Sequence, residues 1–94
     1  MSRGYVDQLF RYLGPDQDVP APDVNTNAQI MSWMVDEYSR VTGSWAPGTF
    51  TGKPVMIGGS LGRATATAQG GYYVLEGYLE SIVQVIAGKR SIIQ

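Results

Sequence analysis

Asp23 has the sequence surroundings best suited to proton transfer. It follows the rigid Pro20-Ala21-Pro22 segment and precedes a helix that the hydrophobic pattern places at residues 26–41. Each Pro holds the residue before it in extended geometry, so this carboxylate is expected to have a fixed position and need not be fully solvated, which would suit a general base. Asp is also common before helices as an N-cap or in an Asx turn, and the residue type leaves both roles open.

A glycine-rich segment at residues 57–71 is the second candidate, because it enters another predicted helix. Free backbone amides and the positive end of a helix dipole can hold an anion there, and Arg63 adds donors suited to a carboxylate. A flexible glycine turn before a Thr-capped helix is the alternative. The segment lacks the Gly-Lys-Ser/Thr of a phosphate loop, and its glycines do not directly follow a strand as a dinucleotide fingerprint requires.

Other polar and aromatic side chains are better explained by packing or solvation. One group has helical spacing and is expected in the core: Met31, Trp33, Met34 and Tyr38. The acidic pairs lack enough convergent oxygens for a metal and are expected to be solvated: Asp16 with Asp18, and Asp36 with Glu37. The chain has neither His nor Cys. We therefore predict no metal site, and proton transfer is left to Asp, Glu, Lys or Tyr.

The amino-acid composition limits which classes of protein this chain can belong to. The 94 residues are 44% hydrophobic and 16% charged, which indicates a packed core in one small domain at most. Seven basic and eight acidic residues are scattered along the chain, so we expect no nucleic-acid partner. An apolar signal core is missing from the first residues, and no apolar run approaches the ~20 residues of a membrane span. We therefore expect a cytoplasmic protein without a membrane partner.

Helical periodicity dominates the first half of the chain. Apolar residues at helical spacing over residues 6–13 predict the last turns of a first helix, which the following Gly-Pro pair ends. The second is predicted at residues 26–41, where Asn25 or Thr26 can cap the first free amides. Gly43 suits the left-handed position after its last turn. These elements would place the loop that carries Asp23 directly before the second helix.

The second half is predicted to be a long loop, a third helix and a strand. Residues 44–63 are rich in Gly, Pro, Ser and Thr, with one short extended segment at residues 55–57. The third helix is expected at residues 65–86, and residues 90–94 form a β-prone run. The predicted architecture is an α/β fold with three helices and short strands.

Five sequence motifs together cover nearly the whole chain: residues 14–29 (GPDQDVPAPDVNTNAQ), 34–38 (MVDEY), 51–54 (TGKP), 58–63 (GGSLGR) and 66–67 (AT). In their order and spacing they closely resemble the hexameric-type glutamate dehydrogenases of the Glu/Leu/Phe/Val dehydrogenase superfamily. Each motif alone is modest, but the set is specific. The Thr-Asn-Ala-Gln sequence after the aspartate favours glutamate over leucine or phenylalanine as the substrate.

The resemblance implies roles for four residues. Asp23 matches the catalytic aspartate, which transfers a proton to and from the substrate amino group. The backbone of Ala21 would face the same nitrogen, and Arg63 would order the site around Asp23 or the substrate. Thr67 would contact the nicotinamide end of NAD or NADP. The implied reaction is the reversible oxidative deamination of L-glutamate to 2-oxoglutarate and ammonium, in a homo-oligomer that is a hexamer when complete.

The sequence departs from the family pattern in two ways. Residues 66–70 read Ala-Thr-Ala-Gln-Gly where relatives often have Ala-Thr-Gly-Arg-Gly, which leaves the choice between NAD and NADP open. The family's upstream lysine motifs and downstream dinucleotide-binding domain are also missing, and neither Lys53 nor Lys89 lies in a matching motif. We therefore expect the chain alone to be inactive, and a parent sequence to continue after Gln94 with a Gly-x-Gly-x-x-Gly/Ala turn.

The resemblance implies a fragment of the substrate (dimerisation) domain. Residues 1–87 would be part of that domain with the interdomain helix, and residues 88–94 the first strand of a truncated Rossmann domain. A dehydrogenase for another amino acid is the alternative within the enzyme class. A non-catalytic helical interaction module is the alternative outside it.

Overall fold

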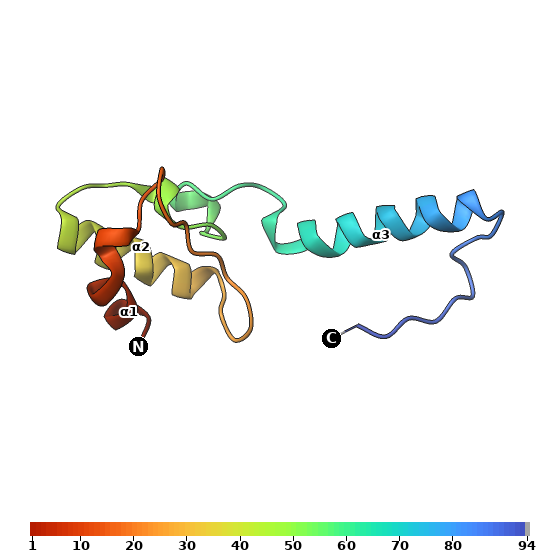
Figure 1. The fold of residues 1–94 in the computed structure, drawn as a ribbon, viewed down its shortest axis with the longest axis horizontal. Helices are drawn as coiled ribbons and strands as arrows, with labels where there is room; N and C mark the ends of the chain where they lie inside the picture. The colour runs from red at the N-terminus through yellow and green to blue at the C-terminus, as the bar shows by residue number, and fades with distance from the viewer. Residues whose placement is uncertain (94) are drawn as a thin grey trace. The chain divides into compact units, whose positions relative to one another are not determined.

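Two units make up the chain, Met1–Arg63 and Ala64–Gln94, and the computed structural model describes residues 1–93 (Figure 1). The first unit begins with α1 (Ser2–Leu9) and the 3-10 helix η1 (Phe10–Tyr12). Apolar side chains at helical spacing face inward from this element, and Val6 is fully buried. The helix therefore ends before the Gly-Pro pair, as predicted, and its last turn has 3-10 geometry.

The second helix, α2 (Ala28–Thr42), begins later than its predicted cap. The side chain of Asn27 accepts a hydrogen bond from the Ile30 amide at 3.0 Å, so Asn27 is the N-cap. Asn25 has a left-handed backbone, with φ of 59°, and the Thr26 hydroxyl is bonded to Asp23 instead. The expectation for Asn25 or Thr26 was wrong. The predicted C-terminal position of Gly43 is confirmed, with φ of 70°.

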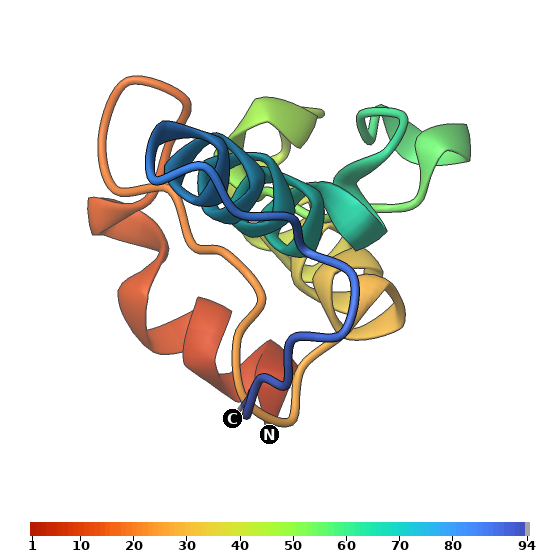
Figure 2. The ribbon, with the colours of Figure 1, turned by 90° about the vertical axis from the view of Figure 1, so that its right-hand side faces the viewer.

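The core of the first unit lies where α1 packs against α2 (Figure 1, Figure 2). Five buried apolar residues form it: Val6, Leu13, Met31, Val35 and Phe50. Leu9, Phe10, Met34 and Tyr38 surround them. Trp33, in contrast, is 44% exposed, so its predicted place in the core was wrong. Its position is one residue away from the inward stripe of α2, which turns the indole toward solvent.

The long loop of the first unit contains two short 3-10 helices, η2 (Pro47–Thr49) and η3 (Val55–Ile57). The predicted extended segment at residues 55–57 is thus a helical turn, because the Ile57 amide bonds back to the Pro54 carbonyl at 3.1 Å. A strand there has no neighbouring strand with which to pair. Between residues 1 and 93 the only β-type pairing is an isolated bridge from Leu13 to Asp18.

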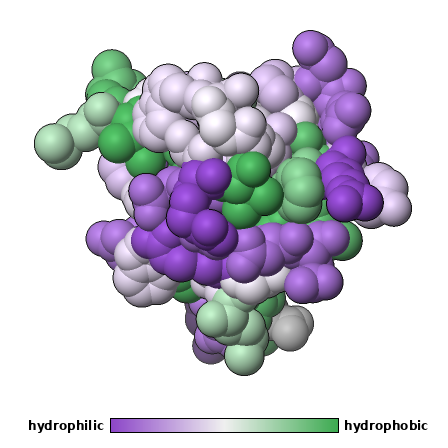
Figure 3. All heavy atoms as spheres, turned by 90° about the vertical axis from the view of Figure 1, so that its left-hand side faces the viewer, coloured by the Kyte–Doolittle hydropathy of each residue, from purple (hydrophilic) through white to green (hydrophobic). Residues whose placement is uncertain are grey.

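An ion-pair network joins the exposed sides of α1 and α2. Arg40 forms two hydrogen bonds with Glu37, at 2.5 and 3.1 Å, and Arg3 reaches the same carboxylate at 3.4 Å. On the face of this unit that Figure 3 shows, hydrophilic side chains form a band with hydrophobic patches beside it. Glu37 is only 5% exposed, so the prediction that the Asp36 and Glu37 pair is solvated was wrong for Glu37. Its two arginine partners make that burial tolerable.

The second unit is built on α3 (Arg63–Ser81). The predicted third helix is confirmed, but it ends five residues before its expected limit. The Gln84 and Val83 amides return to the carbonyls of Leu79 and Glu80 at 2.8 and 3.0 Å, which closes the last turn. Among the described residues, no helix is both long and apolar enough to cross a membrane.

Residues 90–93 form no regular secondary structure, and Gln94 lies outside the described residues. The predicted strand at residues 90–94 is therefore not observed as a strand. A β-strand needs a partner for its amides and carbonyls, and residues 1–93 supply none for this segment. The observed fold of the described chain is helical, with α1, α2 and α3 as its α-helices.

Candidate functional site

The segment that carries Asp23 is held by the loop that follows α2. The Thr51 amide donates a hydrogen bond to the Pro20 carbonyl at 3.0 Å. Next to it, Gly52 lies directly against the ring of Pro22. These two contacts join segments about 30 residues apart in sequence. They fix the backbone on both sides of Ala21 immediately before Asp23.

Asp23 itself is held by its backbone and not by its carboxylate. The Thr26 hydroxyl accepts a hydrogen bond from the Asp23 amide and donates one to the Asp23 carbonyl at 2.7 Å. Within residues 1–93 the carboxylate makes no hydrogen bond or ion pair, and the residue is exposed. In the described chain the Asp23 carboxylate therefore neither caps a helix nor closes an Asx turn. It remains available as a proton acceptor.

Arg63 lies at a cavity of about 280 Å³ beside the same loop. The cavity is lined by Gly48, Phe50, Thr51, Gly52, Lys53, Gly59, Ser60 and Arg63. Gly52 therefore contacts the Asp23 segment through Pro22 and also lines the cavity that Arg63 borders. Ala21, Asp23 and Arg63 all lie in the first unit.

Glycine is required where this loop turns back on itself. A Cβ atom at Gly59 would lie 1.9 Å from the Lys53 carbonyl oxygen, a separation that no side chain tolerates. Lys53 donates from Nζ to the Phe50 carbonyl and so holds the turn from within. Its ammonium is therefore bonded to the loop backbone.

Thr67 lies in the second unit, on the second turn of α3. It is exposed, and within residues 1–93 its hydroxyl makes no hydrogen bond. The nearby Gln69, one of the departures from the family pattern, donates from Nε2 to the Tyr73 hydroxyl at 2.9 Å. Thr67 therefore presents a free donor and acceptor on the helix surface.

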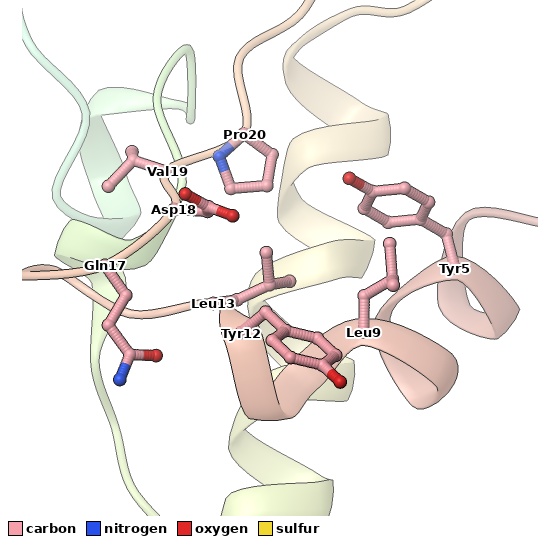
Figure 4. A pocket seen from close by; sticks show the side chains of 8 residues that line it. All are labelled: Tyr5, Leu9, Tyr12, Leu13, Gln17, Asp18, Val19 and Pro20. Atoms are coloured by element: carbon pink, nitrogen blue, oxygen red, sulfur yellow. The ribbon is translucent and has the colours of Figure 1, made fainter.

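A second cavity, of about 500 Å³, lies between α1 and the start of the Pro-rich loop (Figure 4). It is lined by Tyr5, Leu9, Tyr12, Leu13, Gln17, Asp18, Val19 and Pro20. Leu9, Leu13 and Pro20 point toward a common space in Figure 4. None of the four predicted site residues lines it, and the described part of the chain has no cluster of acidic residues able to hold a metal.

Electrostatics in this unit are concentrated at Glu37 and not at the candidate site. Hydrogen bonds from Arg40, and the charge of that guanidinium, lower the pKa of Glu37 to about 2 despite the opposing effect of its burial. The same carboxylate raises the pKa of Arg40. Strong pairing of this kind is typical of a structural ion network, since Glu37 has no carboxylate oxygen free for a substrate.

Gly52 was not identified from the sequence as a site-positioning residue. The Thr-Gly-Lys-Pro motif was recognised, but neither its packing against Pro22 nor its role as a cavity wall is visible in sequence. A glycine next to a β-branched residue in a loop is a common pattern, and only the positive φ of 68° distinguishes this one.

Comparison with known proteins identifies the relatives of the chain. Residues 1–40 match the family Glu/Leu/Phe/Val dehydrogenase, dimerisation domain. The NAD-specific glutamate dehydrogenase of Clostridioides difficile is 61% identical over 70 residues, which are 74% of this chain and 17% of that protein. Its Staphylococcus aureus (strain COL) counterpart is 46% identical over all 94 residues, 23% of that protein. The NADP-specific enzyme of Synechocystis sp. is 46% identical over 84 residues, covering 89% of this chain and 20% of that protein.

Solved structures give the same relationship. The glutamate dehydrogenase of Peptoniphilus asaccharolyticus is 52% identical with a TM-score of 0.78, over 89% of this chain and 21% of that one. The hetero-hexameric glutamate dehydrogenase of Thermus thermophilus is 40% identical with a TM-score of 0.84, over 88% of this chain and 20% of that one. The chain thus spans about a fifth of the length of the proteins it matches. Its first 40 residues match the dimerisation domain of the Glu/Leu/Phe/Val dehydrogenases, and the relatives found for the chain are glutamate dehydrogenases.

Proposed function

We propose that this chain supplies part of the active site for the reversible oxidative deamination of L-glutamate to 2-oxoglutarate and ammonium. The observation that carries the proposal is the carboxylate of Asp23. It is exposed and unpaired within the described residues, while its backbone is fixed by Thr26, and Pro20 is fixed by Thr51. An enzyme base needs this combination, since it must be free to take a proton and held where the proton is released.

The role of Asp23 follows from the chemistry of amine oxidation. Hydride leaves the α-carbon when the substrate nitrogen is unprotonated and its lone pair can form the C=N bond. Asp23 accepts the proton of the substrate ammonium before this step and returns one in the reverse reaction. The Ala21 carbonyl faces the same nitrogen, and Arg63 at the neighbouring cavity pairs with a substrate carboxylate or orders the groups around it.

NAD or NADP supplies the hydride acceptor when bound. The residue that fits it in this chain is Thr67, whose exposed and unbonded hydroxyl matches the donor and acceptor groups of the nicotinamide carboxamide. Relatives of both specificities match the chain. We infer that most of the cofactor site is supplied from outside residues 1–94.

The proposed assembly extends the chain into a larger protein. In it, residues 1–87 form part of a dimerisation domain with the interdomain helix, and residues 88–94 form the first strand of the dinucleotide-binding domain. A homo-oligomer of the hexameric type is the proposed quaternary state. The exposed apolar side chains of the second unit support this, since Tyr78, Ile82 and Val85 are uncovered in the described chain.

A segment exchange tests the proposal. The 94 residues replace their counterpart in the Staphylococcus aureus glutamate dehydrogenase, and the hybrid is assayed with glutamate, leucine and phenylalanine. We expect glutamate to be the preferred substrate, and Asp23→Asn to lower kcat by ~10²-fold or more with the fold intact, because an amide cannot accept the proton. Asp16→Asn changes another exposed carboxylate of the same loop and should leave kcat unchanged. Wild-type kcat in the Asp23→Asn hybrid would overturn the proposal.

A further inference from the structure

Gly52 lies against the Pro22 ring with no room for a side chain between them. A Cβ atom added to Gly52 would lie 2.4 Å from Cγ and 2.7 Å from Cδ of Pro22. Both distances are far below van der Waals contact, so either the ring or the Gly52 backbone would have to move. Only glycine allows the two segments to approach this closely.

The Pro22 ring cannot yield without moving Asp23. Its atoms are closed onto the backbone nitrogen, unlike the end of a flexible side chain, so displacing the ring displaces the peptide that enters Asp23. The other end of the segment is held by the hydrogen bond from the Thr51 amide to the Pro20 carbonyl. The clash therefore acts on the two residues between that anchor and the carboxylate.

We propose that Gly52 is a positioning residue for Asp23: its missing side chain lets Pro22 seat against the loop and sets where the Asp23 carboxylate stands. This inference rests on the proposed function, in which Asp23 is the base. It predicts that a methyl group at Gly52 acts on catalysis through Asp23 and not through general loss of structure.

Gly52→Ala in the segment-exchange hybrid is the test, and Gly43→Ala is its matched control. Both glycines have left-handed backbones, with φ of 68° and 70°, so both variants carry the same conformational strain. A Cβ at Gly43 meets nothing within 4 Å, so only Gly52→Ala adds the clash. We expect kcat for glutamate, normalised to folded enzyme, to fall about 10-fold or more in Gly52→Ala and to be unchanged in Gly43→Ala.

Two double variants identify the route of the effect. In the Asp23→Asn background, Gly52→Ala should cost less than about 2-fold in kcat, because the group it displaces no longer acts. The second double variant combines Gly52→Ala with Pro22→Ala, which removes the ring atoms that collide. In the Pro22→Ala background, Gly52→Ala should lower kcat by a several-fold smaller factor than it does when Pro22 is present.

Failure of this inference is distinguishable from failure of the proposed function. If Asp23→Asn lowers kcat but Gly52→Ala does not, or if Gly52→Ala costs as much in the Asp23→Asn background as it does beside the native carboxylate, the positioning role is wrong and the base remains. If Asp23→Asn keeps wild-type kcat, the proposed function is wrong. A full 10-fold loss in Gly43→Ala would likewise overturn the positioning role, because backbone strain alone would then explain the effect.

Discussion

The Tyr38 hydroxyl donates a hydrogen bond to the backbone carbonyl of Leu13, with 3.0 Å between the two oxygens. Tyr38 lies on α2, and Leu13 begins the loop that leads to Asp23. The Tyr38 ring also packs edge-on against Phe50, with ring centres 5.9 Å apart. One side chain thus connects α2 to the start of the loop that carries Asp23 and to the loop that contains Phe50.

Tyr38→Phe should destabilise the first unit by about 1 kcal/mol, because it leaves the Leu13 carbonyl without its partner while keeping the aromatic packing. Thermal unfolding followed by circular dichroism measures the change. Tyr72→Phe is the control, since the Tyr72 hydroxyl bonds to Glu76 on an exposed face of α3. An equal loss of stability in both variants would contradict the assigned role of Tyr38.

Much of the helical framework could be predicted from sequence, because it depends on local periodicity. The inward stripe of α2 and the left-handed Gly43 both follow from the residues themselves. The N-cap could not be chosen by residue type, since residues 25–27 read Asn-Thr-Asn and each type can cap a helix. Asn27 was selected because Thr26 is already engaged by the Asp23 backbone.

Only those residues of the candidate site that lie in recognisable sequence motifs could be predicted. Asp23 and Arg63 were identified by resemblance, and the loop geometry is consistent with the proposed role of Asp23. The role of Gly52 was not, because it depends on a contact with Pro22 across more than twenty residues of sequence. Such contacts depend on tertiary packing, which has no periodic signature in sequence.

The end of α3 contains a left-handed valine. Val83 has φ of 58° and occupies the position after the helix where glycine is usual. The hydrogen bonds from Val83 to Glu80 and from Gln84 to Leu79 are those of a Schellman motif. A β-branched residue in this conformation carries steric strain that glycine lacks.

Val83→Gly should therefore stabilise the end of α3 by about 0.5–1 kcal/mol, because relief of strain exceeds the added entropy of glycine in the unfolded chain. Backbone chemical shifts of residues 79–83 report the helix population. Val85→Gly is a matched control at an exposed position without a left-handed backbone, and it should bring no gain. A lower helix population in Val83→Gly would show that the valine is not strained there.

The Glu37 network makes the first unit sensitive to acid. Arg40 hydrogen bonds hold the pKa of Glu37 at about 2 in the folded chain, below its ordinary value of 4.5. Because the folded pKa is the lower one, the charged carboxylate contributes stability at every pH above about 4.5. That contribution is lost as the pH falls from 4.5 toward 2, since the unfolded chain then binds the proton that the folded chain resists.

Glu37→Gln removes this titration and leaves Arg40 and Arg3 without their buried partner. We expect the variant to be less stable than the parent at pH 7, and the difference between their unfolding midpoints to shrink steadily between pH 4.5 and 2. Asp16→Asn, which alters a carboxylate without an ion pair in residues 1–93, should show no such convergence. Thermal unfolding of the three proteins in half-unit pH steps measures the difference. A gap between parent and Glu37→Gln that stays constant down to pH 2 would mean that Glu37 does not titrate in this range, and the ion network would then owe its effect to packing alone.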